Sequence, residues 1–213
     1  MTVATLYDVH GNLRALEAVL AEIPSDATIV VGGDVCAGGE HPSEALERLR
    51  ALGERVRWVR GNGDRELTPG EPGLAPGAAL DDTRAKLTDE QIAFLHELPA
   101  TQQIGSTLYC HASPRNDLDV FTDETPEERI AFLFADLDAD VVVCGHTHMQ
   151  FDRVVAGTRV VNSGSVGAPY ADDAGAYWTL DLEPRRTVYP AMSRPQMSPQ
   201  EARALFETFD VAL

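Results

Sequence analysis

The chain has 213 residues, of which 44% are hydrophobic, and this is enough apolar material to bury a sizeable core in one domain. Its formal net charge is −17, from 34 acidic and 17 basic residues. This acidity disfavours a binder of long nucleic acid or of an anionic membrane, because both partners require a basic patch.

The first third of the chain predicts alternating strands and helices. Strands are expected in residues 2–7, 27–34 and 55–59, which are apolar and rich in β-branched side chains. Residues 12–23 and 42–52 place apolar side chains at helical spacing between them. The order β-α-β-α-β is typical of a parallel or mixed sheet with helices outside.

The remaining two thirds predict a mixture of elements. Residues 67–80, rich in Pro and Gly, are expected to be irregular, and residues 81–98 are expected to form a helix. Two strands meet at Gly105, a helix covers 125–137, and a buried strand runs from 140 to 144. Short antiparallel strands follow up to about residue 192, before a final helix at 198–209. Because no repeat or low-complexity linker interrupts this order, we expect a single domain over 1–213.

The cysteines and the N-terminus indicate a reducing compartment. Cys36, Cys110 and Cys144 are too few for a disulfide framework and are predicted to be reduced core residues, with metal binding as the alternative. The start of the chain has neither the basic residues nor the apolar run of a signal peptide. No segment approaches the length of a membrane span. The sequence therefore predicts a cytoplasmic protein that does not bind membranes.

Polar side chains follow the predicted buried strands. The strings YDVHGN, GGDV, RGNGD, YCHAS and CGHTH supply Asp8, His10, Asp34, Asn62, Asp64, His111, His146 and His148. In open α/β sheets, ligands bind beyond the carboxyl ends of the strands, so these side chains are expected to lie together. A single histidine at a strand end often hydrogen-bonds only to backbone, but four of the six histidines of the chain occur here.

This combination of residue types favours a pair of divalent metal ions. Two such ions held ~3.5–4 Å apart clamp a phosphoryl group and generate hydroxide at neutral pH. Mixed imidazole and carboxylate ligands suit transition metals better than Mg or Ca. Asp34 stands alone on its strand end and is the expected bridging ligand. His146 and His148 are expected to point to one side of an extended segment and reach different ions.

The ordered motifs D-x-H, G-D, G-N-x-D, H-x-S and G-H-T-H resemble those of the calcineurin-like metallophosphoesterase superfamily. The strings DVHGN, CHASPRND, GHTHMQF and NSGSVGAP are similar to its small bacterial and archaeal phosphodiesterase branch. The resemblance extends from Asp8 to about Leu182. It implies an α/β fold, a four-layer αββα sandwich of two mixed β-sheets flanked by helices.

The resemblance also implies roles for individual residues. Asp8, His10 and His148 would hold one metal ion, Asn62, His111 and His146 the other, and Asp34 would bridge them. The ions would be divalent transition metals, with Mn preferred and Fe, Zn, Co or Ni as alternatives. The segment NSGSVGAP would support the metal ligands from beneath.

One position departs from the family pattern. Many members carry G-N-H-[DE], where the histidine lies over the leaving group, and this chain has Gly63 there. The expected general acid is therefore missing, and His41, close to the mouth of the site, is the nearest replacement; otherwise it is an exposed loop residue. Asp64 either orders ligands and water or caps a turn, and Arg115 either meets a substrate phosphate or is a surface residue.

The predicted activity is hydrolysis of a small phosphate ester, most readily a phosphodiester, by a metal-bridging hydroxide that attacks in line. Asp34 and Asn62 belong to the catalytic centre, with Gly63, Asp64 and Arg115 next to the substrate. One alternative is a phosphomonoesterase or nucleotide phosphatase. Another is a metal-poor scaffold that binds proteins, which the intact ligand set disfavours. The sequence leaves open whether the chain forms a homo-oligomer.

Overall fold

The computed structural model describes residues 1–73, 77–190 and 195–209. One sheet contains β1 (Val3–Leu6), β2 (Thr28–Val31), β3 (Val56–Trp58), β9 (Ala176–Leu180) and β10 (Glu183–Thr187). The other contains β4 (Thr101–Ile104), β5 (Thr107–Cys110), β6 (Val141–Cys144), β7 (Gln150–Val155) and β8 (Thr158–Ser163). The strand orders are β10-β9-β1-β2-β3 and β4-β5-β6-β8-β7. Both sheets are mixed, because each combines parallel and antiparallel neighbours.

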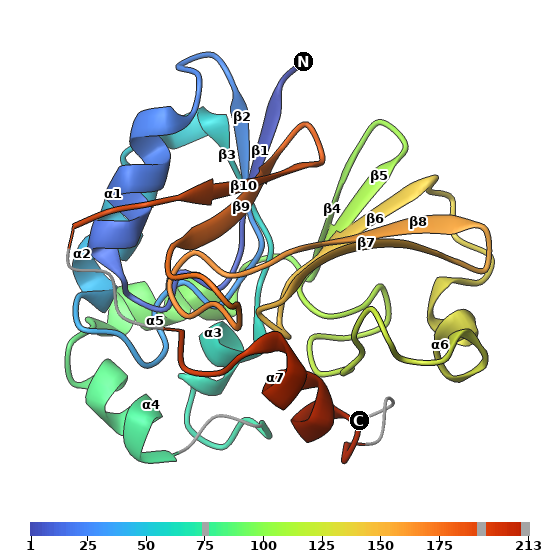
Figure 1. The fold of residues 1–213 in the computed structure, drawn as a ribbon. Coiled ribbons are helices and arrows are strands. Elements are labelled where there is room, and N and C mark those ends of the chain that lie inside the picture. The colour runs from blue at the N-terminus through green and yellow to red at the C-terminus, as the bar shows by residue number, and fades with distance from the viewer. Residues whose placement is uncertain (74–76, 191–194, 210–213) are drawn as a thin grey trace.

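The helices lie outside the two sheets and around one end of them (Figure 1). They are α1 (Leu13–Glu22), α2 (Pro42–Arg50), the 3₁₀ turn η1 (Gly53–Arg55), α3 (Asn62–Glu66), α4 (Gly77–Arg84), α5 (Asp89–His96), α6 (Glu127–Phe134) and α7 (Pro199–Phe206). Figure 1 shows α1 and α2 beside the first sheet and α6 beside the second. The predicted α/β fold, with two mixed sheets flanked by helices, is confirmed.

The core has three parts that correspond to the three interfaces between four layers. Leu6 packs among residues of α1 and α2, whereas its neighbour Tyr7 packs against Val143 of the second sheet. A third cluster joins the second sheet to Ile130 and Phe134 of α6. Successive strand side chains point to opposite faces, so the central strands are apolar throughout because both their faces are buried.

Some local predictions require correction. The helix expected over residues 81–98 is two helices, α4 and α5, because Thr88 caps the start of α5 and accepts a hydrogen bond from the amide of Gln91. The irregular stretch expected over 67–80 includes the start of α4, and its residues 74–76 lie outside the described residues. The glycine-rich turn after β3 opens into the short helix α3.

The cysteines agree with the expectation from the sequence. Cys36, Cys110 and Cys144 are buried free thiols within the apolar clusters. None of the helices in the described ranges combines the length and the apolar character needed to cross a membrane.

Candidate metal centre

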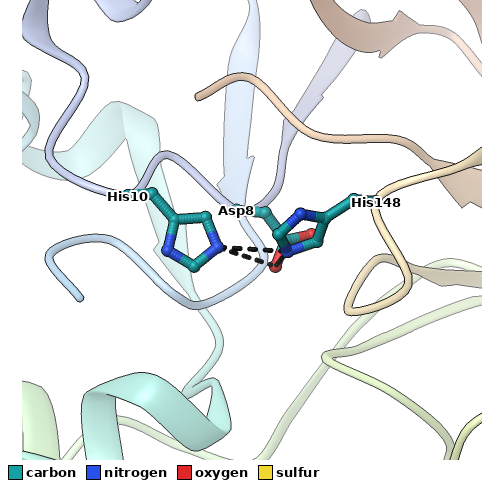
Figure 2. A group of neighbouring side chains, drawn as sticks. All are labelled: Asp8, His10 and His148. Carbon is teal, nitrogen blue, oxygen red and sulfur yellow. Dashed lines mark hydrogen bonds and ion pairs between the residues drawn. The ribbon is translucent and has the colours of Figure 1, made fainter. Parts of the chain in front are cut away.

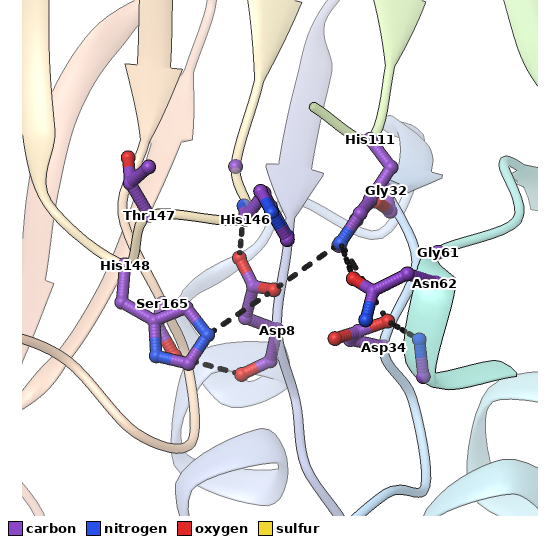
Figure 3. A network of polar contacts seen from close by, with 12 residues as sticks. Asp8, Gly32, Asp34, Gly61, Asn62, His111, His146, Thr147, His148 and Ser165 are labelled. Atoms are coloured by element: carbon purple, nitrogen blue, oxygen red, sulfur yellow. Dashed lines mark hydrogen bonds and ion pairs between the residues drawn. The ribbon is translucent and has the colours of Figure 1, made fainter. Parts of the chain in front are cut away.

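The predicted strand-end side chains gather at one end of the two sheets (Figure 3). They follow strands of both sheets: β1, β2 and β3 of the first, and β5 and β6 of the second. Two groups place one ligand atom from each member within 4.8 Å of the others. The first group is Asp8, His10 and His148 (Figure 2), and the second is Asp8, Asp34 and His111.

Three of the histidines are oriented by backbone carbonyl groups. The Nδ1 atoms of His10, His111 and His148 lie 2.6, 2.8 and 2.7 Å from the carbonyl oxygens of Ala37, Gly32 and Ala168. Because a carbonyl oxygen only accepts, each Nδ1 carries a proton, and in the neutral imidazole each Nε2 then presents a lone pair. This is the outer partner that metal-ligating histidines usually have.

The lone pairs converge. The Nε2 atoms of His10 and His148 lie 3.1 Å apart, and Nε2 of His111 lies 3.1 Å from Oδ1 of Asn62. The amide nitrogen of Asn62 donates to Oε1 of Glu66 at 2.8 Å, which directs the amide oxygen toward His111. Two pairs of hydrogen-bond acceptors therefore face each other, an arrangement that a cation between them stabilises.

Asp8 occupies the middle of this cluster and is completely buried. Its Oδ2 accepts a hydrogen bond from the amide of His146 at 3.0 Å, whereas Oδ1 has no hydrogen-bond partner within the described residues. That oxygen lies 3.5 Å from Nε2 of His148 and 3.9 Å from Nε2 of His10 and of His111. An unpartnered buried carboxylate oxygen is costly, and a divalent ion among these nitrogens would satisfy it. The donor set fits transition-metal binding.

Asp34 lies between the two halves of the cluster. Its Oδ1 is 3.6 Å from Nε2 of His111, and its Oδ2 is 3.9 Å from Nε2 of His10. The backbone amide of Gly63 donates to Oδ1 at 2.7 Å and fixes the carboxylate. The two oxygens thus face opposite halves of the site, as a bridging ligand requires.

Burial and neighbouring charges set the protonation states. Burial alone would raise the pKa of Asp8, but His148, His111 and His10 together lower it, so Asp8 is ionised. Burial lowers the pKa of His146 to about 4, and the neighbouring His111 adds to this effect. The imidazole of His146 is therefore neutral near pH 7, which is the form that binds metal.

The backbone at the site is strained in a consistent way. Asp8, His10, Asp34, His146 and His148 all have left-handed φ angles, between 48° and 64°. Such values are uncommon outside glycine and cluster at functional sites. The prediction of an extended segment at 146–148 is therefore wrong. The chain bends there, and the amide of Thr147 donates to the carbonyl of Gly145 at 2.7 Å.

His146 and His148 consequently diverge. The ring of His148 lies near His10, with centroids 4.9 Å apart, whereas the ring of His146 lies near His111, with centroids 5.1 Å apart. The structure therefore places the two imidazoles in different halves of the site, by a bend rather than by strand periodicity.

Gly63 and Asp64 have structural places next to Asp34. A Cβ atom at Gly63 would lie 2.9 Å from Cβ of Ala37 and 3.0 Å from Oδ1 of Asp34, so a side chain there requires a shift. Asp64 is completely buried and accepts hydrogen bonds from the amides of Asp34, Val35 and Gly61 at 2.8–3.0 Å. The substrate contact expected for Asp64 has no support in this geometry, because its carboxylate holds the ligand-bearing loops together.

Arg115 and His41 lie farther from the centre of the cluster. Arg115 pairs with the carboxylate of Asp119 and lines a cavity of about 230 Å³ next to His111. The side chain of His41 is 43% exposed, with Nδ1 3.8 Å from Oε1 of Glu44. His41 lines a cavity of about 440 Å³ together with His10. A smaller cavity of about 190 Å³ lies directly over the site and includes His10, Asp34, Gly63 and His148.

Other residues support the site without any chemical motif of their own. Asn162 donates to the carbonyl of Gly145 at 2.7 Å, and the hydroxyl of Ser165 donates to the carbonyl of Asp8 at 2.8 Å. Both belong to NSGSVGAP, which the resemblance places beneath the ligands. Tyr170 was not anticipated: its ring lies 4.9 Å from that of His148, at 31°. Aromatic residues in loops are too common for the sequence to single it out.

Comparison with known proteins identifies the family of the chain. The profile of the calcineurin-like phosphoesterase superfamily domain matches residues 1–185. A symmetrical bis(5′-nucleosyl)-tetraphosphatase of Pectobacterium atrosepticum is 35% identical over 102 residues, which cover 45% of this chain and only 36% of that protein.

Two solved structures share the fold over most of their length. A metallophosphoesterase from Sphaerobacter thermophilus has a TM-score of 0.72 at 26% identity, with 89% of each chain covered. A protein of Pyrococcus horikoshii has a TM-score of 0.73 at 20% identity, with 97% of this chain and 92% of that one covered. The fold, the ordered motifs and the profile lead to one conclusion: the chain belongs to the calcineurin-like phosphoesterase superfamily.

Proposed function

We propose that this chain is a phosphodiesterase that depends on two divalent metal ions and hydrolyses a small phosphate ester, acting as a single domain. Membership of the superfamily supports a hydrolase acting on phosphate esters. The observation that carries the metal dependence is the convergence of acceptors, in which Nε2 of His10 faces Nε2 of His148 at 3.1 Å beside the unpartnered Oδ1 of Asp8.

The ligand assignment follows the two halves of the cluster. Asp8, His10 and His148 would hold one ion, Asn62, His111 and His146 the other, and Asp34 both. When bound, the ions lower the pKa of water and neutralise charge on the phosphoryl oxygens. Manganese is the proposed metal, with Fe, Zn, Co or Ni as alternatives, because imidazole and carboxylate donors together suit these ions.

The protein's own groups position the reactants. In hydrolysis a water oxygen bonds to phosphorus, the ester P–O bond breaks, and the departing oxygen takes a proton. The cavity of about 190 Å³ over Asp34, Gly63 and His148 is the proposed place for the scissile phosphoryl group. His41 shares a cavity wall with His10 and is the proposed proton donor. Arg115 is paired with Asp119, and we propose that it contacts the substrate away from the scissile phosphoryl group.

A diester is proposed over a monoester because space for a second ester group adjoins the site in the cavity of about 440 Å³. The name of the Pectobacterium relative, a bis(5′-nucleosyl)-tetraphosphatase, is consistent with a substrate that carries organic groups on both sides of its phosphates.

The test is hydrolysis of bis(p-nitrophenyl) phosphate and of p-nitrophenyl phosphate by protein loaded with Mn²⁺, with elemental analysis of the same sample. We expect about two metal ions per chain and a larger kcat/KM for the diester. Preference for the monoester would indicate a phosphomonoesterase. Absence of both metal and hydrolysis would indicate a protein-binding scaffold, and full activity in excess chelator would refute the metal dependence.

A further inference from the structure

The cavity of about 440 Å³ adjoins the metal centre and is named here the Arg14 cavity. Its walls are His10, Gly11, Asn12, Arg14, Gly38, Gly39, Glu40, His41, Gly167, Ala168, Tyr189 and Gln196. Four of these residues, His10, Gly38, Ala168 and Gln196, also line the cavity of about 190 Å³ over Asp34. The two cavities therefore meet at His10, and a ligand with its phosphorus over the metal centre extends naturally into the larger one.

Three polar side chains of this wall are available to a ligand. Arg14, Glu40 and Gln196 are exposed, and within the described ranges their side chains have no hydrogen bond or ion pair with another residue. The hydroxyl oxygen of Tyr189 accepts from the amide of Asn12 at 3.2 Å, so its own proton is free to donate. The wall thus offers both donors and acceptors to a ligand.

Asn12 gives the cavity a rigid floor. Its Oδ1 accepts from the amide of Ala15 at 3.1 Å and caps α1, while its side-chain nitrogen also donates to the carbonyl of Gly167 at 3.1 Å. The start of α1 is thereby fixed to the turn that supports the metal ligands. Arg14 lies in the first turn of the same helix and lines the same cavity as His10.

The chemistry of the wall selects among classes of ligand. A second phosphate is disfavoured, because the carboxylate of Glu40 lies in the same wall as the unpaired guanidinium of Arg14. An apolar alcohol is disfavoured, because the only apolar side chains in the described wall are Ala168 and the ring of Tyr189. An uncharged group with hydroxyl and amide functions satisfies both the donors and the acceptors. The volume lies within the range of small-molecule sites.

We propose that the Arg14 cavity binds one of the two alcohol groups of the phosphodiester, and that this group is of nucleoside size with several hydrogen-bonding functions. This inference rests on the proposed phosphodiesterase activity and specifies its substrate class. Arg14, Glu40 and Gln196 are then the residues that determine specificity.

Two diesters with the same leaving group test the proposal. Thymidine 5′-(p-nitrophenyl phosphate) and methyl p-nitrophenyl phosphate both release nitrophenolate and differ in the alcohol that remains. We expect kcat/KM to be about 10–100-fold higher for the thymidine ester, because two or three hydrogen bonds each contribute modestly. In Arg14→Ala and in Gln196→Ala the ratio of the two kcat/KM values should fall about 5-fold.

Arg129→Ala is the matched control. Arg129 is an exposed arginine near the start of another helix, α6, on the far side of the second sheet from α1, and it lines none of the cavities described above. We expect it to leave both kcat/KM values unchanged. Equal melting temperatures of the variants would show that they are folded.

The outcomes separate this inference from the proposed function. Hydrolysis of both esters with equal kcat/KM overturns the inference and leaves the phosphodiesterase proposal intact. If neither ester is hydrolysed, the proposed function fails, and NMR titration with thymidine then tests the Arg14 cavity separately. Thymidine binding that weakens at least about 5-fold in Arg14→Ala supports the inference. Absence of thymidine binding overturns the inference. Competition by tripolyphosphate but not by thymidine, lost in Arg14→Ala, would mean an anion site and would overturn it too.

Discussion

The carboxylate of Asp34 reaches both halves of the cluster, with 3.6 Å to Nε2 of His111 and 3.9 Å to Nε2 of His10. We expect Asp34→Asn to reduce kcat by more than the roughly 10–100-fold that loss of an outer partner costs. The amide oxygen would keep the hydrogen bond from Gly63, and the NH₂ group would then face His10 and repel a cation. Metal content and kcat are the measurements.

His148→Ala is the comparison for Asp34→Asn, because His148 belongs to only one of the two groups. It should lose less activity and about one metal ion per chain. If Asp34→Asn keeps two metal ions and most of its rate, the bridging role is wrong.

His41 supplies a second prediction at the scale of one residue. Proton donation to a leaving group contributes typically ~10²–10⁴-fold, and nitrophenolate needs no proton. We therefore expect His41→Ala to slow methyl-leaving diesters at least ~10²-fold and nitrophenyl diesters hardly at all. The measurement is the slope of log kcat against leaving-group pKa, which should steepen in the variant. An unchanged slope would assign the proton to another group.

At the scale of elements, Arg65 ties the short helix α3 to the loop after β5. Its Nε and Nη2 donate to the two carboxylate oxygens of Asp117 at 2.8 and 3.0 Å. Burial would raise the pKa of Asp117, but the ion pair with Arg65 outweighs it and the pKa is lowered. A lowered carboxyl pKa contributes stability above its unfolded value, about 4, and this stability is lost as the pH falls through the folded value.

We expect Asp117→Asn to lower the free energy of unfolding by about 1.5–3 kcal/mol at pH 7. Urea unfolding at several pH values should show this difference shrinking below about pH 4. Asp81→Asn is the control, since Asp81 is 76% exposed in its pair with Arg84 and such pairs contribute ~0–1 kcal/mol. A difference that stays constant down to pH 2 would assign the effect to packing instead of charge.

The C-terminal helix α7 reaches the candidate metal centre through aromatic contacts. The ring of Tyr170 lies between His148, at 4.9 Å, and Phe206 of α7, at 6.2 Å. Arg203 of α7 also pairs with Asp123 at 2.7 Å, which ties the helix to the segment before α6. An element beyond residues 1–185, where the family profile matches, therefore supports the ring that packs on His148.

We expect Tyr170→Ala to weaken Mn²⁺ binding about 10-fold, because loss of a partner that orients a ligand costs ~10–100-fold. Tyr170→Phe keeps the ring and should bind Mn²⁺ as the native protein does. Titration calorimetry gives the dissociation constants. Equal constants for all three proteins would show that the stacking does not orient His148.

For the whole molecule, the proposed metal binding would be a source of folding stability, because the facing acceptors come together only in the folded chain. A ligand at 100 times its Kd stabilises the folded state by ~2.7 kcal/mol, and 1 kcal/mol shifts the Tm of a chain this long by ~2–4 °C. We expect Mn²⁺ at that concentration to raise the Tm by about 5–10 °C. Scanning calorimetry of the native protein and of Asp34→Asn, each with Mn²⁺ and with chelator, measures this rise in Tm. An equal rise in Tm for Asp34→Asn and for the native protein would contradict the prediction.

The sequence by itself determined the fold class and which polar side chains end the buried strands. Apolar runs such as Thr28–Val31, separated by helical periodicity, require a sheet buried on both faces. Each run ends in Asp, Asn or His, and the carboxyl ends of neighbouring parallel strands meet at one edge. Proximity of Asp8 and Asp34 follows from that order, because they come after the parallel neighbours β1 and β2. His111 follows β5 of the second sheet and joins them only when the two sheets pack.

Only the tertiary structure decided how those side chains are aimed and what surrounds them. The left-handed backbone of His146 and His148, the carbonyls that orient the imidazoles of His10, His111 and His148, and the burial of Asp64 next to Asp34 all depend on loops from different strands meeting. The Arg14 cavity likewise arises where the starts of α1 and α2 come together with Tyr189. Local sequence encodes strand and helix preference at short range, whereas these contacts join residues 20 or more positions apart, and they form only when the chain packs.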